Sequence, residues 1–349
     1  MKIFCQCSGK KTISRNRGDY ITEIQLMKGL SNFAEVYYSG KRFDPNIGNF
    51  GMKDYEGTIL DMARRQKYDA YYVRNNPKLF TKLKGKKIYF FSPYDRRSFE
   101  GADAIASLTG SLTERLKNGI DTHGYPKNYK CDKVYTFHQI VDPMFKPLQN
   151  HPKTKKIRES IGGGFIMGHF GSLRKSCFPY SFSKILPNIK KEHPEVNVVF
   201  STKKSQNCHD LLNRHIKERS FAYADMPYAI SACDLILYNF RGTDGHFVGS
   251  MKILEAMSCG VPVFAPRFDA RVEELGEDYE MFHSFSANGG RFSAKIEKEM
   301  KQKLISFIED VSLRKKLREK VLGRSKFYQM MQSKKRLKRT MEEILSRKS

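Results

Sequence analysis

The sequence predicts an α/β protein with two doubly wound domains, each built on a parallel sheet. A chain of 349 residues is long enough for two domains of ordinary size. Short apolar runs alternate with segments whose apolar residues recur at helical spacing, which is typical of parallel strands connected by helices. Residues 251–276 show the pattern most clearly, because a one-sided helix, a glycine and a continuous apolar strand follow one another there.

The first half of the chain alternates strands and helices. Residues 20–30 form one helix, since their apolar side chains repeat on one face. A second helix is expected at residues 111–118, and strands at residues 1–7, 34–38, 68–73, 87–91 and 104–107.

A polar, basic, proline-containing segment follows at residues 148–160 and indicates an interdomain linker. We therefore expect an N-terminal domain at residues 1–147, a linker at 148–162, a second domain at 163–322 and a basic helix at 323–349.

The second half begins with a strand at residues 165–170 and a tight turn at Gly171 and Ser172. The glycines at 162–164 precede this strand, so they do not form a dinucleotide-binding fingerprint, which follows its strand. A helix at 182–189 and strands at 196–200 and 235–238 come next. Residues 239–249 follow a predicted parallel strand, and loops at that end of a sheet line ligand clefts in α/β proteins.

Glu255 is the unusual residue of the predicted helix 251–259, because it lies among apolar neighbours. Burying an unpaired carboxylate costs several kcal/mol, so such a residue has a partner or a ligand. Gly260 is placed to end the helix, and Pro266 ends the strand 261–265. Another helix is expected within residues 269–275.

The order E-A-M at 255–257 followed by C-G-V-P-V at 259–263 resembles the second domain of GT-B glycosyltransferases of family GT4. Residues 137–147 are similar to the segment N-G-V-D-x-x-x-F-x-P that closes the first domain of that family. Asp142, Phe145 and Pro147 match, while Gln139 and Ile140 replace Asn-Gly. The resemblance implies two Rossmann-like domains facing a cleft, a last helix that crosses back to the first domain, and chemistry without a metal.

The resemblance also implies a reaction. A hexosyl- or pentosyltransferase of this kind moves a sugar from a UDP- or GDP-sugar to a hydroxyl of a glycan, lipid or protein-linked acceptor, with retention. Glu255 would accept hydrogen bonds from the ribose. Arg174 and Lys175, with Gly171 and Ser172, would take the place of the family's diphosphate-binding element, in an altered order.

In the family, another Glu stands eight residues before the Glu of E-A-M and is the first Glu of the motif. This chain has Phe247 at that position. Asp244 and His246 are the nearest candidates to replace it as catalytic groups. Asp244 before a glycine is also good turn chemistry, and His246 is also typical of an exposed loop. The expected nucleotide-binding set is completed by Gly249, Ser250, Met251 and Lys252.

The formal net charge is +26, and residues 311–349 hold 14 Lys and Arg against 3 Glu. Such a charge favours polyanions or phosphorylated ligands, and a solvated basic surface explains it as well. We expect peripheral contact with an anionic membrane, but no specific nucleic-acid binding, because no RNA- or DNA-binding motif occurs. A polyanion-binding protein and a nucleotide-sugar epimerase of the same fold stay open as alternatives.

The seven cysteines are scattered and form no C-x-x-C pair, which indicates free thiols in a reducing compartment. The N-terminus has no apolar segment typical of a signal peptide, and no apolar run reaches 18 residues. The sequence therefore predicts a cytoplasmic protein. It contains no metal-binding motif, and we expect no cofactor beyond the donor substrate.

Overall fold

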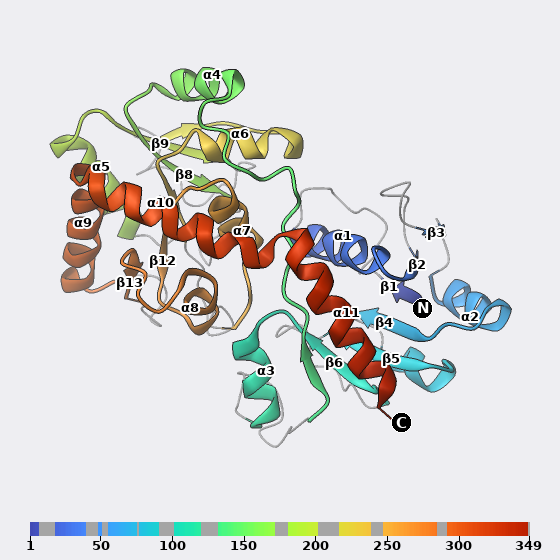
Figure 1. Cartoon of the computed structure of the whole chain (residues 1–349). Helices are drawn as coiled ribbons and strands as arrows, with labels where there is room; N and C mark the ends of the chain where they lie inside the picture. Colours follow the sequence, from blue (N-terminus) through green and yellow to red (C-terminus); the bar gives the residue numbers. More distant parts are fainter. Residues whose placement is uncertain are drawn as a thin grey trace. The chain divides into compact units, whose positions relative to one another are not determined.

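The computed structural model describes residues 1–6, 18–39, 48–50, 55–74, 77–90, 101–119, 132–171, 181–201, 216–238, 247–284 and 292–347 (Figure 1). The chain forms two compact units. Unit 1 comprises Met1–Asp142, Phe247–Met251 and Phe327–Ser349, and unit 2 comprises Pro143–His246 and Lys252–Lys326.

Unit 1 is built on a parallel sheet with the strand order β3-β2-β1-β4-β5-β6-β7. The order reverses between β1 and β4, because Ile3 of β1 pairs with both Val36 of β2 and Ala70 of β4. The five predicted strands are confirmed, and β3 and β7 are additional. The bounds are β1 Lys2–Gln6, β2 Glu35–Ser39, β3 Gly48–Phe50, β4 Ala70–Arg74, β5 Lys86–Phe90, β6 Ala104–Ser107 and β7 Val134–Thr136.

Helices cover both faces of this sheet. Alternate residues of each strand point to opposite faces. Ile3 therefore packs in a cluster with α1 (Gly18–Ser31) and α11 (Met330–Ser346). Phe4 packs in another cluster with α2 (Tyr55–Arg65), α3 (Gly110–Lys117) and the 3-10 helix η1 (Pro77–Lys82).

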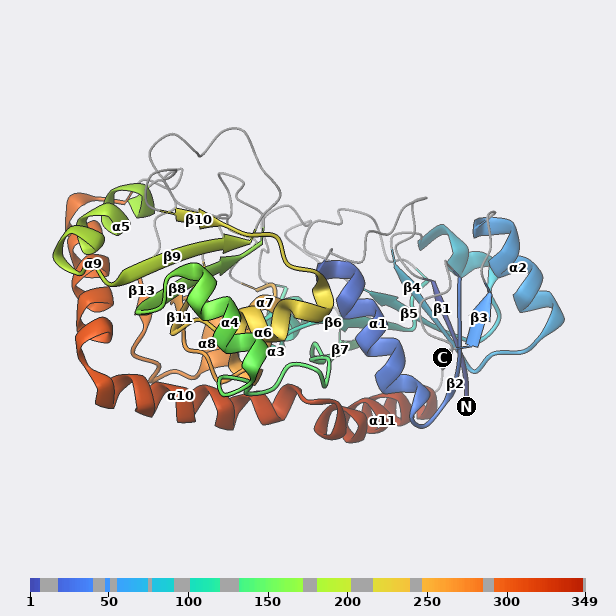
Figure 2. The same cartoon turned by 90° about the horizontal axis from the view of Figure 1, so that it is seen from above.

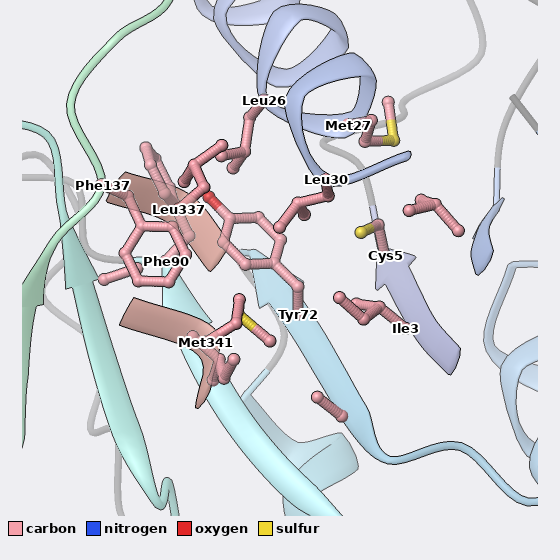
Figure 3. Close-up of a cluster of buried hydrophobic side chains, with 14 of the residues drawn as sticks. Ile3, Cys5, Leu26, Met27, Leu30, Tyr72, Phe90, Phe137, Leu337 and Met341 are labelled. Atoms are coloured by element: carbon pink, nitrogen blue, oxygen red, sulfur yellow. The ribbon is translucent and has the colours of Figure 1, made fainter. Parts of the chain in front are cut away.

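The last helix, α11, belongs to the core of unit 1. Its side chains Leu337 and Met341 lie in the same cluster as Leu30 of α1 (Figure 3). Tyr72 lies inside this cluster, with ring centroids 5.8 Å from Phe90 and 6.3 Å from Phe137. The expected return of the last helix to the first domain is confirmed.

Unit 2 has a second parallel sheet with the order β10-β9-β8-β11-β12-β13, which reverses between β8 and β11 (Figure 2). Its strands are β8 Phe165–Phe170, β9 Val196–Ser201, β10 Ile216–Glu218, β11 Leu235–Leu237, β12 Val263–Pro266 and β13 Phe282–His283. Its helices are α4 Pro152–Ile161, α5 Ser181–Glu192, α6 Met226–Ser231, α7 Met251–Ser258, α8 Asp269–Leu275, α9 Ala294–Glu309 and α10 Val311–Ser325, with 3-10 turns η2 Tyr223–Asp225 and η4 Lys326–Tyr328.

Residues 148–162, expected to be a linker, contain the helix α4. His151 caps its first turn, Pro152 occupies the first helical position, and Gly162 ends it with a φ of 115°. Only Thr154 and Ile161 of this helix are buried, which explains why its sequence is as polar as a linker.

The helix–glycine–strand prediction at residues 251–266 is confirmed. Gly260 has a φ of 71° and follows α7, and the Val261 amide bonds back to the Ala256 carbonyl at 2.9 Å. Among the described residues, no helix is long and apolar enough to cross a bilayer.

Candidate functional site

The strand reversal between β8 and β11 marks the first candidate site. In open α/β sheets, ligands bind outside the carboxyl ends of the strands where the order reverses. Gly171 follows β8 at this point, and Tyr238 follows β11. The Gly171 amide donates to the Ser201 carbonyl at 3.1 Å, so its N–H is already used within the sheet.

Lys252, in the first turn of α7, lies directly against Gly171. A Cβ atom at Gly171 would come within 2.2 Å of the Lys252 Nζ, and the φ of 150° also favours glycine. Lys252 as a residue is exposed. The fold thus brings together two of the predicted site residues and places the Lys252 side chain at the end of β8.

Glu255 lies three residues beyond Lys252 on α7, and only 5% of it is exposed. Residues at this spacing share one helix face. Burial chiefly, and the charge of Glu255 in addition, raise the pKa of the neighbouring Cys259 thiol to about 12. This helix therefore carries a lysine at an exposed position and a buried carboxylate three residues further along, which suits a ligand that carries both an anionic group and hydroxyl groups.

Two buried residues that were not predicted from the sequence lie at the same carboxyl ends of the strands of unit 2. Arg271 of α8 is 1% exposed, pairs with Glu274, and lies 5.2 Å from the ring centroid of Tyr238. His283, at the end of β13, is buried against aromatic rings, and burial lowers its pKa to about 4. A charged residue on a short helix is normally predicted to be exposed, so the burial of Arg271 could not be predicted from the sequence.

Five other predicted site residues lie outside the described part of the chain: Ser172, Arg174, Lys175, Asp244 and His246. Their roles stay predictions.

Gly249, Ser250 and Met251 belong to unit 1 by their contacts. A Cβ at Gly249 would come within 2.6 Å of the Gln139 Oε1, so this glycine permits a close approach to the segment after β7. Ser250 and Met251 are both buried. Their assignment to nucleotide binding stays a prediction.

Phe247, which stands where the family has its first Glu, anchors this segment. The ring is 3% exposed, and the Arg115 guanidinium lies 3.9 Å from its centroid. The Phe247 carbonyl accepts a hydrogen bond of 2.7 Å from the Thr109 hydroxyl. The position is used for packing inside unit 1, so an aromatic residue there has a structural reason.

A second polar cluster lies in unit 1 at its own strand reversal. Arg74, the last residue of β4, bonds to Glu23 of α1 at 2.8 Å, and the side chains are 11% and 3% exposed. Arg74 also lies 4.7 Å from the ring centroid of Phe90. Nearby on α1, Gln25 donates to Asp142 at 2.7 Å. Sequence reasoning missed this cluster, because the partners are far apart in the chain.

Within the described ranges, no group of three or more His, Cys, Asp or Glu side chains is arranged to hold a metal ion. Metal-independent chemistry stays a prediction.

Comparisons with known proteins identify the fold. No family model matches the sequence, and no curated protein matches it. Among solved structures, a glycosyltransferase from Rickettsia africae superposes with a TM-score of 0.74 at 12% identity, over 99% of both chains. HepE from Anabaena, in complex with UDP-glucose, gives 0.71 at 14% identity, over 98% of this chain and 100% of that one.

A sucrose-phosphate synthase from Thermosynechococcus elongatus gives a TM-score of 0.69 at 10% identity, over 99% of both chains. At such low identity, these similarities establish the architecture alone. The chain has the GT-B fold: two Rossmann-like domains with parallel sheets, and a C-terminal helix that packs on the first.

Proposed function

We propose that this protein is a glycosyltransferase that moves a sugar from a nucleoside diphosphate sugar, with UDP as the first candidate nucleotide, to a hydroxyl acceptor. The observation that carries the proposal is the placement of Lys252 against Gly171 at the strand reversal of unit 2, with the buried Glu255 three residues further along α7. HepE, which shares the fold, was solved with UDP-glucose.

In this proposal the two α7 side chains have different roles. Glu255 accepts hydrogen bonds from ribose hydroxyls, since a shielded carboxylate forms strong charge-assisted bonds. Lys252 stabilises the negative charge that develops on the diphosphate when its bond to the anomeric carbon breaks. The acceptor oxygen forms the new bond to that carbon while its proton passes to the departing diphosphate oxygen, and the resemblance to GT4 enzymes implies retention. Arg174 and Lys175 would add charge to the diphosphate site.

The acceptor would lie at the polar cluster of unit 1. Glu23 and Arg74 neutralise each other beneath the surface, so this region carries no large net charge. Such a surface suits the hydroxyl groups of a carbohydrate acceptor better than a strongly anionic group.

The proposal is tested by thermal shift with UDP-, GDP-, ADP- and CMP-sugars on the wild type, on Glu255→Ala and on Glu319→Ala. Glu319 is exposed on α10 and serves as the matched control. A ligand at 100 times its dissociation constant stabilises the protein by about 2.7 kcal/mol. We expect one nucleotide to shift the wild type and the control but not Glu255→Ala. The absence of any shift in the wild type would contradict the donor site.

The same donor distinguishes the transferase from an epimerase of this fold. Incubation with the donor alone, followed by analysis of the sugar, reveals an epimer only for the epimerase. We expect an unchanged donor, or slow release of the nucleotide, until a hydroxyl acceptor is added.

We also propose peripheral contact of unit 1 with an anionic membrane. Met331 of α11 is 76% exposed, and Phe327 of the preceding turn η4 is 42% exposed. Lys335, Lys338 and Arg339 are exposed on α11. Apolar side chains beside basic ones are typical of interfacial helices.

Sedimentation with phosphatidylcholine vesicles, with and without phosphatidylserine, tests this contact. Phe327→Ser/Met331→Ser should reduce binding to the anionic vesicles. Val311→Ser is the control, since Val311 is 66% exposed but belongs to unit 2. Equal binding by all three proteins would contradict a role for this surface.

A further inference from the structure

Unit 2 contains a cavity of about 410 Å³ at the amino ends of its strands, whereas Gly171 and Lys252 lie at the carboxyl ends. Asp234 and Pro262 line it, and they precede the strands β11 and β12. It is therefore at the amino ends of these parallel strands, whereas Gly171 follows the carboxyl end of β8. Its volume falls in the range of small-molecule sites.

The lining of this cavity is strongly basic. Four cations, Arg158, Arg314, Lys315 and Arg318, face a single carboxylate, Asp234. Arg158 and Asp234 neutralise each other, because Arg158 Nη2 bonds to Asp234 Oδ2 at 2.8 Å. Three positive charges on α10 remain for the cavity.

Lys315 and Arg318 are the cations available for a ligand. Neither forms an ion pair or hydrogen bond with any residue that the structure describes, and Lys315 is exposed while Arg318 is half-buried. Arg314 differs, since its guanidinium donates to the Phe307 carbonyl at 3.2 Å and also to the Ile308 carbonyl. Its remaining N–H groups and its charge still contribute.

A buried hydroxyl gives independent evidence of a ligand. Thr154 of α4 lines the cavity and is 1% exposed, and its Oγ1 has no hydrogen-bond partner in the described part of the chain. An unsatisfied buried hydroxyl destabilises the fold, so the native state normally provides a partner.

The N-terminus of α10 also favours an anion in this cavity. Val311, its first residue, lines the cavity, and a helix N-terminus favours anions. The Asp310 carboxylate accepts the Leu313 amide at 2.9 Å and offsets part of this effect. The side chains of Lys315 and Arg318, rather than the helix end, therefore supply most of the attraction.

We propose that this cavity binds a small phosphate-bearing anion, at a site separate from the proposed donor site. Lys315 and Arg318 bind the phosphate oxygens, and the Thr154 hydroxyl donates a further hydrogen bond. A phosphate suits the site because its oxygens accept several charge-assisted hydrogen bonds at once. The recess favours a compact ligand over an extended polyanion.

Isothermal titration with pyrophosphate tests the proposal, on the wild type and on Lys252→Gln, in which the proposed donor site has lost its cation. The variant Lys315→Gln/Arg318→Gln removes the two available cations. We expect its affinity to fall at least about tenfold, since a hydrogen bond to a charged group contributes about 1.5–3 kcal/mol. Thr154→Val keeps the side-chain volume and should weaken binding about threefold or more, without loss of thermal stability.

The matched control is Lys295→Gln/Lys298→Gln, which makes the same change in net charge on α9. Both lysines are exposed and do not line the cavity. Unchanged affinity in the control supports a specific site. An equal loss in both double variants, or no binding by the wild type, overturns the proposal.

The donor-site result is independent of this outcome. Glu255→Ala should retain pyrophosphate binding at the cavity even though it loses the sugar nucleotide. A protein that binds no sugar nucleotide but shows the cavity-dependent affinity would contradict the proposed function and leave this site intact.

Discussion

The strand reversals of the two sheets have the same topology but opposite chemistry. In unit 1, Arg74 and Glu23 form a buried ion pair, so the two charges neutralise each other. In unit 2, Gly171 has no side chain, and the space beside it is taken by the exposed Lys252. One reversal is neutral and closed by the protein's own side chains, whereas the other presents a cation.

The proposed function assigns a different ligand to each of these two reversals. A buried, neutralised pair leaves the surface above it without a strong charge, which suits a neutral, hydroxyl-rich group. A lysine side chain beside Gly171 adds positive charge at the end of β8, which favours an anionic group. The proposed function therefore uses one reversal for an anion and the other for a neutral polar group, and the following changes test this contrast.

The largest effect is expected from Arg74→Ala in unit 1. The substitution leaves the Glu23 carboxylate, 3% exposed, without its guanidinium partner. Breaking a buried pair in this way costs about 3–5 kcal/mol of stability. Thermal unfolding measures the loss. Arg64→Ala is the control, because its pair with Asp61 is exposed and 3.8 Å long, and it should change the stability by less than about 0.5 kcal/mol. Similar effects of the two substitutions would show that the neutral reversal does not depend on its buried pair.

Acid should destabilise unit 2 through His283. Burial lowers the pKa of this imidazole from 6.5 to about 4, so the unfolded chain takes up a proton at a higher pH than the folded one. The free energy of unfolding should therefore fall as the pH drops from about 6.5 to 4, by about 3 kcal/mol in total. Unfolding by denaturant across this pH range measures the slope. His283→Asn keeps a polar group beside the Ser284 carbonyl and should flatten the profile. An equally steep profile in that variant would assign the acid sensitivity to other groups.

A smaller effect on stability is expected for Gly171→Ala, with a clear effect on binding. Alanine at a φ of 150° is strained by about 1–3 kcal/mol, and its Cβ displaces the Lys252 ammonium group. We expect lower stability together with weaker binding of the sugar nucleotide. Gly163→Ala is a control of the same kind, since its φ is 64° and nothing lies within 4 Å of the added Cβ. It should lower stability without changing donor affinity, and weaker donor binding by this control as well would remove the link to Lys252.

The features of unit 2 that depend on the spacing of neighbouring residues could be predicted from the sequence. The helix, glycine and strand at residues 251–266 follow from the spacing of apolar residues, and the Glu255 anomaly was visible because one charge interrupted an apolar face. The proximity of Gly171 and Lys252 was not visible, because it depends on the register between distant elements.

The neutral reversal of unit 1 could not be predicted for the same reason. The Glu23–Arg74 pair joins a helix to a strand across 51 positions, and each residue alone is typical of a solvated surface. The short strands β3, β7 and β13 contain only two or three residues, too few for a period to show. At residues 148–162 the sequence was misleading in another way. The helix α4 has one narrow buried face, so its composition is as polar as that of a linker.

The most specific test of the contrast is Lys252→Gln. The substitution removes the charge beside Gly171 but keeps a long polar side chain on an exposed helical position, so the stability should change by less than about 0.5 kcal/mol. If the ammonium group binds the donor diphosphate, the affinity should fall about tenfold and depend less steeply on salt concentration. Titration with the preferred sugar nucleotide at two salt concentrations measures both effects, and Lys298→Gln is the control for net charge. Unchanged affinity would mean that the anion binds at the strand reversal of unit 2 through residues other than Lys252. The chemical contrast with unit 1 would then no longer depend on Lys252.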